Sequence, residues 1–147
     1  MKNLELSLKT WVKLARSFNT INKVVNEEIN TYGVTPSQFG VLEALYHLGD
    51  MPIGKLGEKI LVTGGNMTVI LDNLEKQGYI ERIKSPTDRR SLFIKLTEKG
   101  KTLIDQVFPG HKLFVAEIIS VLTEEEQIVL GSLLKKLGLS IKNKKEE

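Results

Sequence analysis

Positive charge is concentrated in one twenty-residue stretch of the chain, from Arg82 to Lys101. The stretch holds seven basic and two acidic residues, a local net charge of +5, whereas the whole chain of 147 residues carries only +3. The rest of the chain has 14 basic and 16 acidic residues and therefore sums to −2. A charge run along a helix is usually only a solvated face. A local patch on an otherwise balanced protein is instead typical of a surface that binds phosphate groups.

The middle of this stretch predicts a tight turn. Pro86 favours a turn in the segment Ser85–Asp88, because its ring presets the backbone angle that such turns use. Asp88, Arg89 and Arg90 are therefore expected near the tip. Arginine is favoured in a narrow minor groove of DNA, which carries an enhanced negative potential. The turn is thus a candidate DNA contact.

The flanking residues predict the hairpin that would carry this turn. Apolar residues alternate with others at Leu92, Ile94 and Leu96, which is the period of a half-buried strand. The segment 79–84 is its less regular partner. A two-stranded basic hairpin is therefore expected here.

A helix directly precedes the hairpin and carries a second polar surface. Its buried side is predicted by apolar residues at steps of three and four: Met67, Ile70, Leu71 and Leu74. The helix would run from about residue 64 to 77 and end at Gly78. The opposite side carries small and hydrogen-bonding residues: Thr63, Gly64, Gly65, Asn66, Thr68, Val69, Asp72 and Asn73. In isolation this is an ordinary exposed face. The basic hairpin that follows favours a face that reads base edges and phosphates.

The first thirty residues predict one long helix that ends at Tyr32-Gly33. Its stripe alternates steps of four and three, as in a heptad pattern: Leu4, Leu8, Trp11, Ala15, Phe18, Asn22, Val25 and Ile29. Leu14, Ile21 and Val24 add a second apolar edge, so the helix should be packed on more than one side. It is either a buried core helix or one that pairs with a second copy.

A capping box predicts the next helix. Thr35 and Gln38 have the spacing at which each side chain bonds the other residue's backbone N–H, and Pro36 lies in the first turn, where its missing N–H costs nothing. This helix should end at Gly49, and a short helix at about 53–61 should follow.

Two further helices are expected after the hairpin. The first begins near Thr97, and Pro109-Gly110 should kink or split it. A second capping box, Thr123 with Glu126, opens the last helix, which should end at Gly138. Its inward residues are expected to be Leu130, Leu134 and Leu137.

Several classes of protein are disfavoured by what the sequence lacks. It has no cysteine, which excludes disulfides, thiolate metal sites and thiol redox chemistry. His47 and His111 lack paired carboxylates at metal-ligand spacing, and no catalytic motif is found. There is no long apolar run and no leader. We expect one cytoplasmic domain that is not an enzyme, with no cofactor, no metal and no membrane contact.

Two stretches resemble the MarR family of bacterial transcription regulators. They are TGGNMTVILDNLEKQGYIER at 63–82 and DRRSLFIKLTEKG at 88–100, with its Asp-x-Arg at Asp88 and Arg90. The resemblance extends over nearly the whole chain. It implies a mainly α fold with a small β-hairpin wing, that is, a winged helix-turn-helix with N- and C-terminal dimerisation helices. The single domain, 1–147, would contain dimerisation helices at about 1–32 and 101–140 and a DNA-binding lobe at about 35–100.

The resemblance also implies roles for individual residues. The helix from about residue 64 to 77 would enter the major groove, with Arg90 in the adjacent minor groove. Residues at the DNA would be Thr63, Gly65, Asn66, Thr68, Val69, Asn73, Arg89 and Arg90. Asp88 would orient Arg90 by a charge-assisted pair. Asp72 is unexpected on this face, because its negative charge would be repelled by the phosphates of DNA. This suggests that Asp72 pairs with another residue or orders water. The cysteine of peroxide-sensing members is absent, so no thiol switch operates.

Three functional hypotheses follow. The first is a homodimeric repressor of a pseudo-palindromic operator on double-stranded DNA, released by a small aromatic or phenolic effector. Candidate effector-lining residues are Trp11, Phe18, Phe39, Tyr46, His47 and Phe114, each of which also fits an ordinary core position. The second is a ligand-independent regulator controlled by its abundance or by a protein partner. The third is a winged-helix module for protein interaction, against which the charged wing argues.

Overall fold

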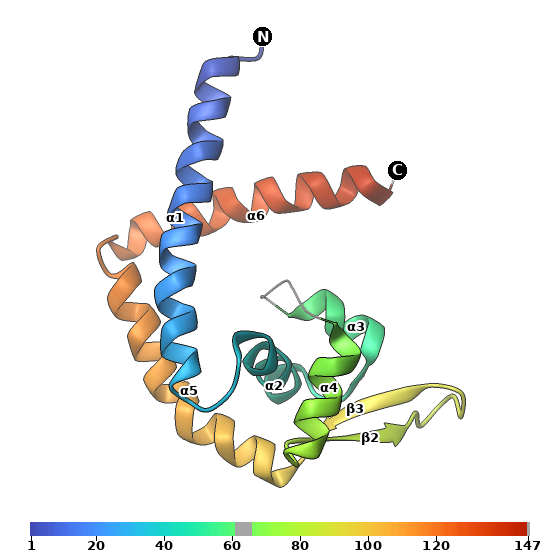
Figure 1. Ribbon diagram of the computed structural model, residues 1–147. Coiled ribbons are helices and arrows are strands. Elements are labelled where there is room, and N and C mark those ends of the chain that lie inside the picture. The colour runs from blue at the N-terminus through green and yellow to red at the C-terminus, as the bar shows by residue number, and fades with distance from the viewer. Residues whose placement is uncertain (61–65, 147) are drawn as a thin grey trace. The chain divides into compact units, whose positions relative to one another are not determined.

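The computed structural model describes residues 1–60 and 66–146 and is mostly helical, with a small antiparallel sheet (Figure 1). Its elements are α1 (Leu4–Asn30), α2 (Pro36–Leu48), β1 (Met51–Pro52), α3 (Ile53–Lys59), α4 (Met67–Lys76), β2 (Ile80–Lys84), β3 (Leu92–Leu96), α5 (Glu98–Ile119) and α6 (Glu124–Glu146). The chain divides into two compact units, residues 1–111 and 112–147. The predicted fold class is confirmed.

The core of the first unit is formed by apolar side chains from its helices and its sheet. Leu42 of α2, Leu56 of α3, Leu71 and Leu74 of α4 and Ile94 of β3 are all fully buried. Burying a side chain of this size contributes about 1.5–3 kcal/mol. The predicted stripe of α4 is therefore its buried side, and the opposite side of that helix is left in solvent.

Local capping fixes the start and end of α2 as predicted. Thr35 Oγ1 accepts from the backbone N–H of Gln38 at 3.1 Å, and Gln38 Oε1 accepts from the N–H of Thr35 at 3.0 Å. At the other end Gly49 has φ +86°, which favours glycine, and its N–H donates to Leu45 O. These interactions are encoded within a few residues, which is why the sequence predicts them.

The hairpin is part of a three-stranded sheet in the order β1-β3-β2. β2 and β3 pair as expected, with Arg82 opposite Ile94. The short strand β1 was missed: Met51 pairs with Ile94, and Pro52 with Phe93. A two-residue strand that includes proline shows no alternation, so its sequence gives no sign of pairing. In β3 the alternation holds only in part, because Leu92 is 47% exposed while Ile94 is buried.

The residues that follow β3, Thr97 and Lys99, are hydrogen-bonded to the C-terminal end of α4. Thr97 Oγ1 donates to Gly78 O at 2.6 Å, and the N–H of Thr97 donates to Tyr79 O at 3.0 Å. Lys99 Nζ donates to Gln77 O at 2.6 Å. These contacts supply hydrogen-bond partners to the carbonyl of the C-cap residue Gln77 and to the two carbonyls that follow it, Gly78 O and Tyr79 O. Thr97 also caps α5, accepting from the N–H of Gly100 at 3.2 Å.

Gly100 is required by close packing rather than by its backbone angle. A Cβ at this position would lie 2.3 Å from Tyr79 O and 2.7 Å from Leu96 Cδ1. Gly100→Ala should therefore lower the free energy of unfolding by about 1–3 kcal/mol, as overpacking does, in a urea titration. Gly54→Ala in α3 is the control, because its added Cβ meets no atom within 4 Å. Equal stability of the two variants would contradict this packing.

The long helix α5 runs through Pro109 without interruption. Of the two outcomes predicted for Pro109-Gly110, a kink or a split, the split does not occur. A proline inside a helix removes one hydrogen bond and costs about 3 kcal/mol, which a helix of 22 residues can offset. The boundary between the two compact units follows directly, after His111.

In the second unit, α6 begins as predicted and ends later than predicted. The capping box is present: Glu126 N–H donates to Thr123 Oγ1 at 3.2 Å and Thr123 N–H to Glu126 Oε1 at 3.1 Å. The helix passes Gly138 and continues to Glu146. One interior glycine costs only about 1 kcal/mol, and no proline follows it.

The expected inward side of α6 is not buried within the chain. Leu130, Leu134 and Leu137 are 42%, 42% and 48% exposed, so the prediction that they face an intramolecular core is wrong. Periodic leucines mark a surface that will be covered, but they do not say whether the cover comes from the same chain.

Candidate nucleic-acid interface

The outward face of α4 presents short polar side chains and one apolar side chain. Asn66 is the N-cap, and its Oδ1 accepts from the N–H of Thr68 at 2.9 Å. Thr68, Asn73 and Val69 are exposed, Val69 by 54%. Because Asn66 caps the helix, α4 begins at Met67 rather than near Gly64. The amide nitrogen of Asn66 and the Thr68 hydroxyl can hydrogen-bond base edges or phosphates, and Val69 suits a thymine methyl group.

Part of the predicted reading surface lies outside the described residues. Thr63, Gly64 and Gly65 fall within 61–65, so their predicted contacts stay predictions. The described part of the surface is Asn66, Thr68, Val69, Asp72 and Asn73, all exposed.

The wing tip is an ordered turn that exposes two arginines. The N–H of Ser85 donates to Ser91 O at 3.0 Å, which closes the hairpin. Ser85 is buried, and its Oγ accepts from the N–H groups of Thr87 and Asp88 at 3.3 and 3.2 Å. Arg89 and Arg90 are exposed at the tip, as predicted.

Asp88 orients the backbone of the turn rather than the guanidinium of Arg90. Its Oδ1 accepts from the backbone N–H of Arg90 at 3.0 Å, and Ser91 Oγ lies 3.4 Å from its Oδ2. Among the described residues Arg90 has no ion pair, so the expected side-chain pair with Asp88 is not found. This leaves the Arg90 guanidinium available for a phosphate or a groove.

The acidic residue on the reading helix is paired. Arg82 of β2 donates from Nη2 to Asp72 Oδ1 at 2.7 Å and from Nη1 to Glu75 Oε1 at 2.8 Å. The hydrogen bond to Asp72 raises the pKa of Arg82 above its ordinary value, and Glu75 adds to this. Of the two roles suggested for Asp72, the structure shows pairing.

The +5 of the basic stretch therefore overstates the charge that faces solvent. Arg82 is half-buried and is paired with two carboxylates of α4. The other basic residues of the stretch are exposed: Lys84, Arg89, Arg90, Lys95, Lys99 and Lys101. In Figure 1 the hairpin, drawn in yellow-green to yellow, lies next to α4, and its tip projects beyond the helix. The charge thus gathers on the wing, next to the polar face of the helix.

Three of the predicted effector residues belong to one row of aromatic rings in the first unit. Phe39 lies 4.9 Å from His111 between ring centres, and His111 lies 6.2 Å from Phe108. Phe108 is 4.7 Å from His47, which is 5.1 Å from Tyr46. Phe108 and His111 of α5 were missed, because their contacts join residues far apart in the chain.

Charged groups flank this row. His111 Nδ1 lies 2.8 Å from Glu28 Oε2, and both side chains are largely buried, which ties α5 to α1. The Tyr46 hydroxyl donates to Asp105, and this bond raises the pKa of Tyr46. The row therefore combines ring surfaces with two polar groups that are paired with carboxylates, His111 with Glu28 and Tyr46 with Asp105.

The other three predicted effector residues do not join the row in the described structure. Trp11 and Phe18 are 62% and 57% exposed and line a groove along α1 with Leu14, Ala15 and Asn19. Phe114 is half-buried and belongs to the second unit.

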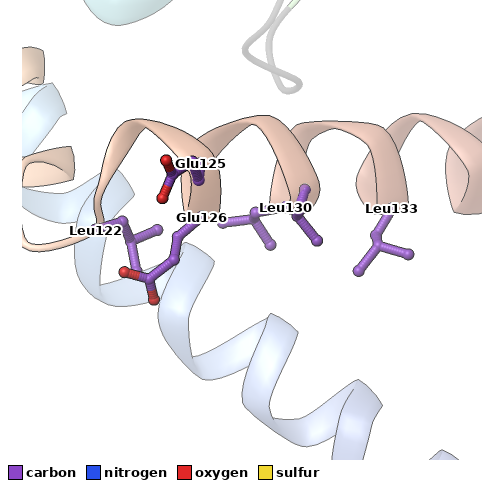
Figure 2. A pocket seen from close by; sticks show the side chains of 6 residues that line it. Leu122, Glu125, Glu126, Leu130 and Leu133 are labelled. Atoms are coloured by element: carbon purple, nitrogen blue, oxygen red, sulfur yellow. The ribbon is translucent and has the colours of Figure 1, made fainter.

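The helices at the two ends of the chain each expose an apolar surface. On α1 these residues include Leu4, Leu8, Trp11 and Phe18. On α6 a groove is lined by Leu122, Glu125, Glu126, Val129, Leu130 and Leu133, five of which are labelled in Figure 2. Val129 and Leu133 are each 58% exposed. Surfaces of this kind mark interaction sites.

Comparisons with known proteins agree with this geometry. The sequence model of the MarR family matches residues 34–92. The HTH-type transcriptional regulator MhqR of Bacillus subtilis (strain 168) is 44% identical over 138 residues, which cover 94% of this chain and 95% of the relative. The HTH-type transcriptional repressor MdtR of the same strain is 30% identical, over 94% of this chain and 85% of the relative.

A solved structure is similar in fold. It is that of NadR in complex with 4-hydroxyphenylacetate, with a TM-score of 0.72 and 25% identity, covering 86% of this chain and 89% of that one. Within the described residues of the present structure, no helix has the length and apolar composition needed to cross a membrane. The polar helix face, the arginine-tipped wing and the relatives together lead to one conclusion: this chain belongs to the MarR family of winged helix-turn-helix regulators, which bind DNA and control transcription without being enzymes.

Proposed function

We propose that the protein is a homodimeric repressor that binds a pseudo-palindromic operator and is released by a small aromatic effector. The observation that carries the DNA-binding part is the polar face of α4 beside a wing that exposes Arg89 and Arg90. The helix face would read bases in the major groove, and Arg90 would enter the adjacent minor groove. Asn66, Thr68, Val69 and Asn73 would supply base and phosphate contacts, and the same role is proposed for Thr63 and Gly65.

Dimerisation is supported by apolar surface that the single chain leaves uncovered. Trp11 and Phe18 on α1, and Val129 and Leu133 on α6, are each more than half exposed. A soluble chain rarely exposes so many large apolar side chains unless a partner covers them. A two-fold dimer presents two reading helices to half-sites about one helical turn apart.

The repressor assignment is supported by the relative MdtR, whose name describes a transcriptional repressor. The effector assignment is supported by NadR, crystallised with a phenolic acid, and by the aromatic row of this chain. Phe39, Tyr46 and His47 remain candidates for the effector site, and Phe108 and His111 join them. Trp11 and Phe18 fit the dimer surface better, because they line the exposed groove of α1.

Release would follow from the spacing of the two reading helices. An effector that binds better to a dimer whose reading helices are mis-spaced shifts the population away from the form that fits the operator. By thermodynamic linkage the operator then weakens effector binding by the same factor. This mechanism needs no chemistry on the effector, in keeping with a protein that would act in the cytoplasm as a switch.

The test begins with a duplex that the purified protein selects from a randomised library, called here the selected duplex. Its affinity is compared with that of a shuffled duplex of equal composition, at several salt concentrations and with a panel of phenolic compounds. Tight, salt-sensitive binding to the selected duplex alone supports the regulator, and loss with one compound supports the effector. A regulator whose binding no compound alters would be controlled by abundance or a protein partner. Failure to enrich any duplex would favour a protein-interaction module.

Asn66 provides a prediction about base reading. Its Oδ1 already caps α4, so Asn66→Ala removes both a cap, worth about 1 kcal/mol, and the amide. Asn66→Ser keeps a capping oxygen and removes only the amide. We expect Asn66→Ser to weaken binding to the selected duplex by about 1–3 kcal/mol and to leave the affinity for the shuffled duplex unchanged. Both affinities are measured by fluorescence anisotropy. Equal losses on both duplexes would make Asn66 a phosphate contact instead.

A further inference from the structure

We propose that Arg82 is a positioning residue for DNA reading, which holds the wing and the reading helix at a fixed angle by bridging Asp72 and Glu75. The proposal rests on the proposed function, because it concerns how two DNA-contacting elements are kept in register. Arg82 itself need not touch DNA.

The bridge joins the two elements directly. Arg82 lies on β2, and its two terminal nitrogens go to different carboxylates of α4, at 2.7 Å to Asp72 and 2.8 Å to Glu75. Its side chain is 21% exposed, whereas those of Asp72 and Glu75 are 49% and 43% exposed. The guanidinium therefore lies between strand and helix, while the carboxylates lie at the edge of the reading face.

Asp72 is on the same side of α4 as the reading residues. It follows Thr68 by four positions and Val69 by three, the spacings that bring side chains together on one helix face. An unpaired carboxylate here would face the phosphates of bound DNA and be repelled. A carboxylate held by Arg82 is neutralised and serves as an attachment point.

The bridge adds a polar attachment to the apolar packing that already joins the hairpin and α4, where Ile80 and Ile94 share a buried cluster with Leu71 and Leu74. Other polar contacts lie at the C-terminal end of α4, where Thr97 and Lys99 bond backbone carbonyls. Apolar packing is not directional, so these polar contacts alone fix the angle of the hairpin only at that end. The Arg82 bridge lies further along the helix and adds a directional contact there. A site held by two supports keeps its geometry within the narrow limits that recognition requires.

A positioning role and a simple charge effect predict different DNA affinities for variants of this bridge, because Arg82 carries a positive charge and Asp72 and Glu75 carry negative charges. Arg82→Lys keeps the positive charge, but an ammonium lacks the planar fork that reaches two carboxylates at once. If Arg82 acted only through its charge, this variant would bind DNA like the unmodified protein. Asp72→Asn with Glu75→Gln removes two negative charges beside the DNA, so charge alone would tighten binding to every duplex.

We expect both variants to lose selectivity. The ratio of affinities for the selected and shuffled duplexes should fall by at least about tenfold in Arg82→Lys, a change of about 1.4 kcal/mol. In Asp72→Asn/Glu75→Gln, affinity for the shuffled duplex should rise while the ratio falls. Thermal unfolding should change little, because an ion pair whose carboxylates remain 49% and 43% exposed contributes little to stability. A merely structural role would lower the melting temperature and leave the ratio of affinities among folded molecules unchanged.

Lys84→Arg is the matched control, because Lys84 is an exposed cation at the end of the same strand. It should keep the selectivity of the unmodified protein. If the unmodified protein discriminates between the duplexes and both variants do so equally well, the positioning role is overturned and the proposed function stands. If the unmodified protein does not discriminate, the proposed function fails and the positioning role fails with it.

Discussion

Arg90→Ala should abolish selective DNA binding while leaving the fold and the dimer intact. Arg90 is exposed at the wing tip, and its only hydrogen bond in the described structure is from its backbone N–H to Asp88, which alanine retains. The substitution therefore removes only the guanidinium. A good arginine contact in a groove contributes about 1–3 kcal/mol, and a dimer has two wings, so the selected duplex should bind at least about 30-fold more weakly.

The measurement is a fluorescence anisotropy titration, with the oligomeric state checked by sedimentation. Arg89→Ala is the matched control, because it removes the same charge one residue away at the same turn. Arg89→Ala should make DNA binding less dependent on salt concentration. It should lower the affinity for both duplexes to a similar extent, and by less than Arg90→Ala lowers the affinity for the selected duplex. Similar losses in the two variants would mean that the tip acts only through its charge. Loss of the dimer in Arg90→Ala would mean that the wing has been misplaced.

The features that the sequence predicts correctly are those that neighbouring residues encode. The capping boxes at Thr35 and Thr123 depend on a partner three residues away, and both are present. The turn at Pro86 and the buried stripe of α4 are likewise local patterns. They were enough to predict a reading helix followed by an arginine-tipped wing, because each element's own pattern says which side is exposed.

The features that the sequence does not predict join distant residues. Glu28 and His111 are 83 positions apart, and nothing in either segment indicates the pair. The aromatic row has the same origin, since Phe108 is placed next to His47 only by the packing of the first unit. The strand β1 also depends on a distant partner. The sequence therefore predicts the three members of the aromatic row on α2, Phe39, Tyr46 and His47, and does not predict Phe108 and His111 on α5.

Counting charges also has a limit that the structure makes plain. Arg82 adds to the local excess of positive charge in the sequence. In the structure it forms ion pairs with Asp72 and Glu75 instead of facing a ligand. The acidity of Asp72 and one of the positive charges of the stretch, that of Arg82, thus belong to the same ion pair. A net charge per segment predicts where a polyanion binds, but it does not separate cations that face solvent from cations that join two elements.

A periodic apolar pattern also does not say whether the same chain or a second copy covers that face. Leu133→Glu should convert the dimer to a monomer that no longer binds the selected duplex. Leu133 is 58% exposed and lines the groove of α6 (Figure 2). If a second copy covers this groove, each glutamate would lose its hydration in an apolar interface at a cost of several kcal/mol. Two copies together should raise the dimer dissociation constant at least about a thousandfold.

Lys135→Gln is the control, because it also lowers the net charge by one and lies on the other side of the helix, about 200° away. It should remain a dimer in a sedimentation equilibrium experiment and keep its selectivity. The monomeric Leu133→Glu chain should still show helical circular dichroism, because the buried core around Leu42 and Leu71 belongs to the first unit alone. Since one chain reads only one half-site, selectivity would be lost even with an intact wing. A Leu133→Glu protein that stays dimeric would show that this groove is not the dimer surface.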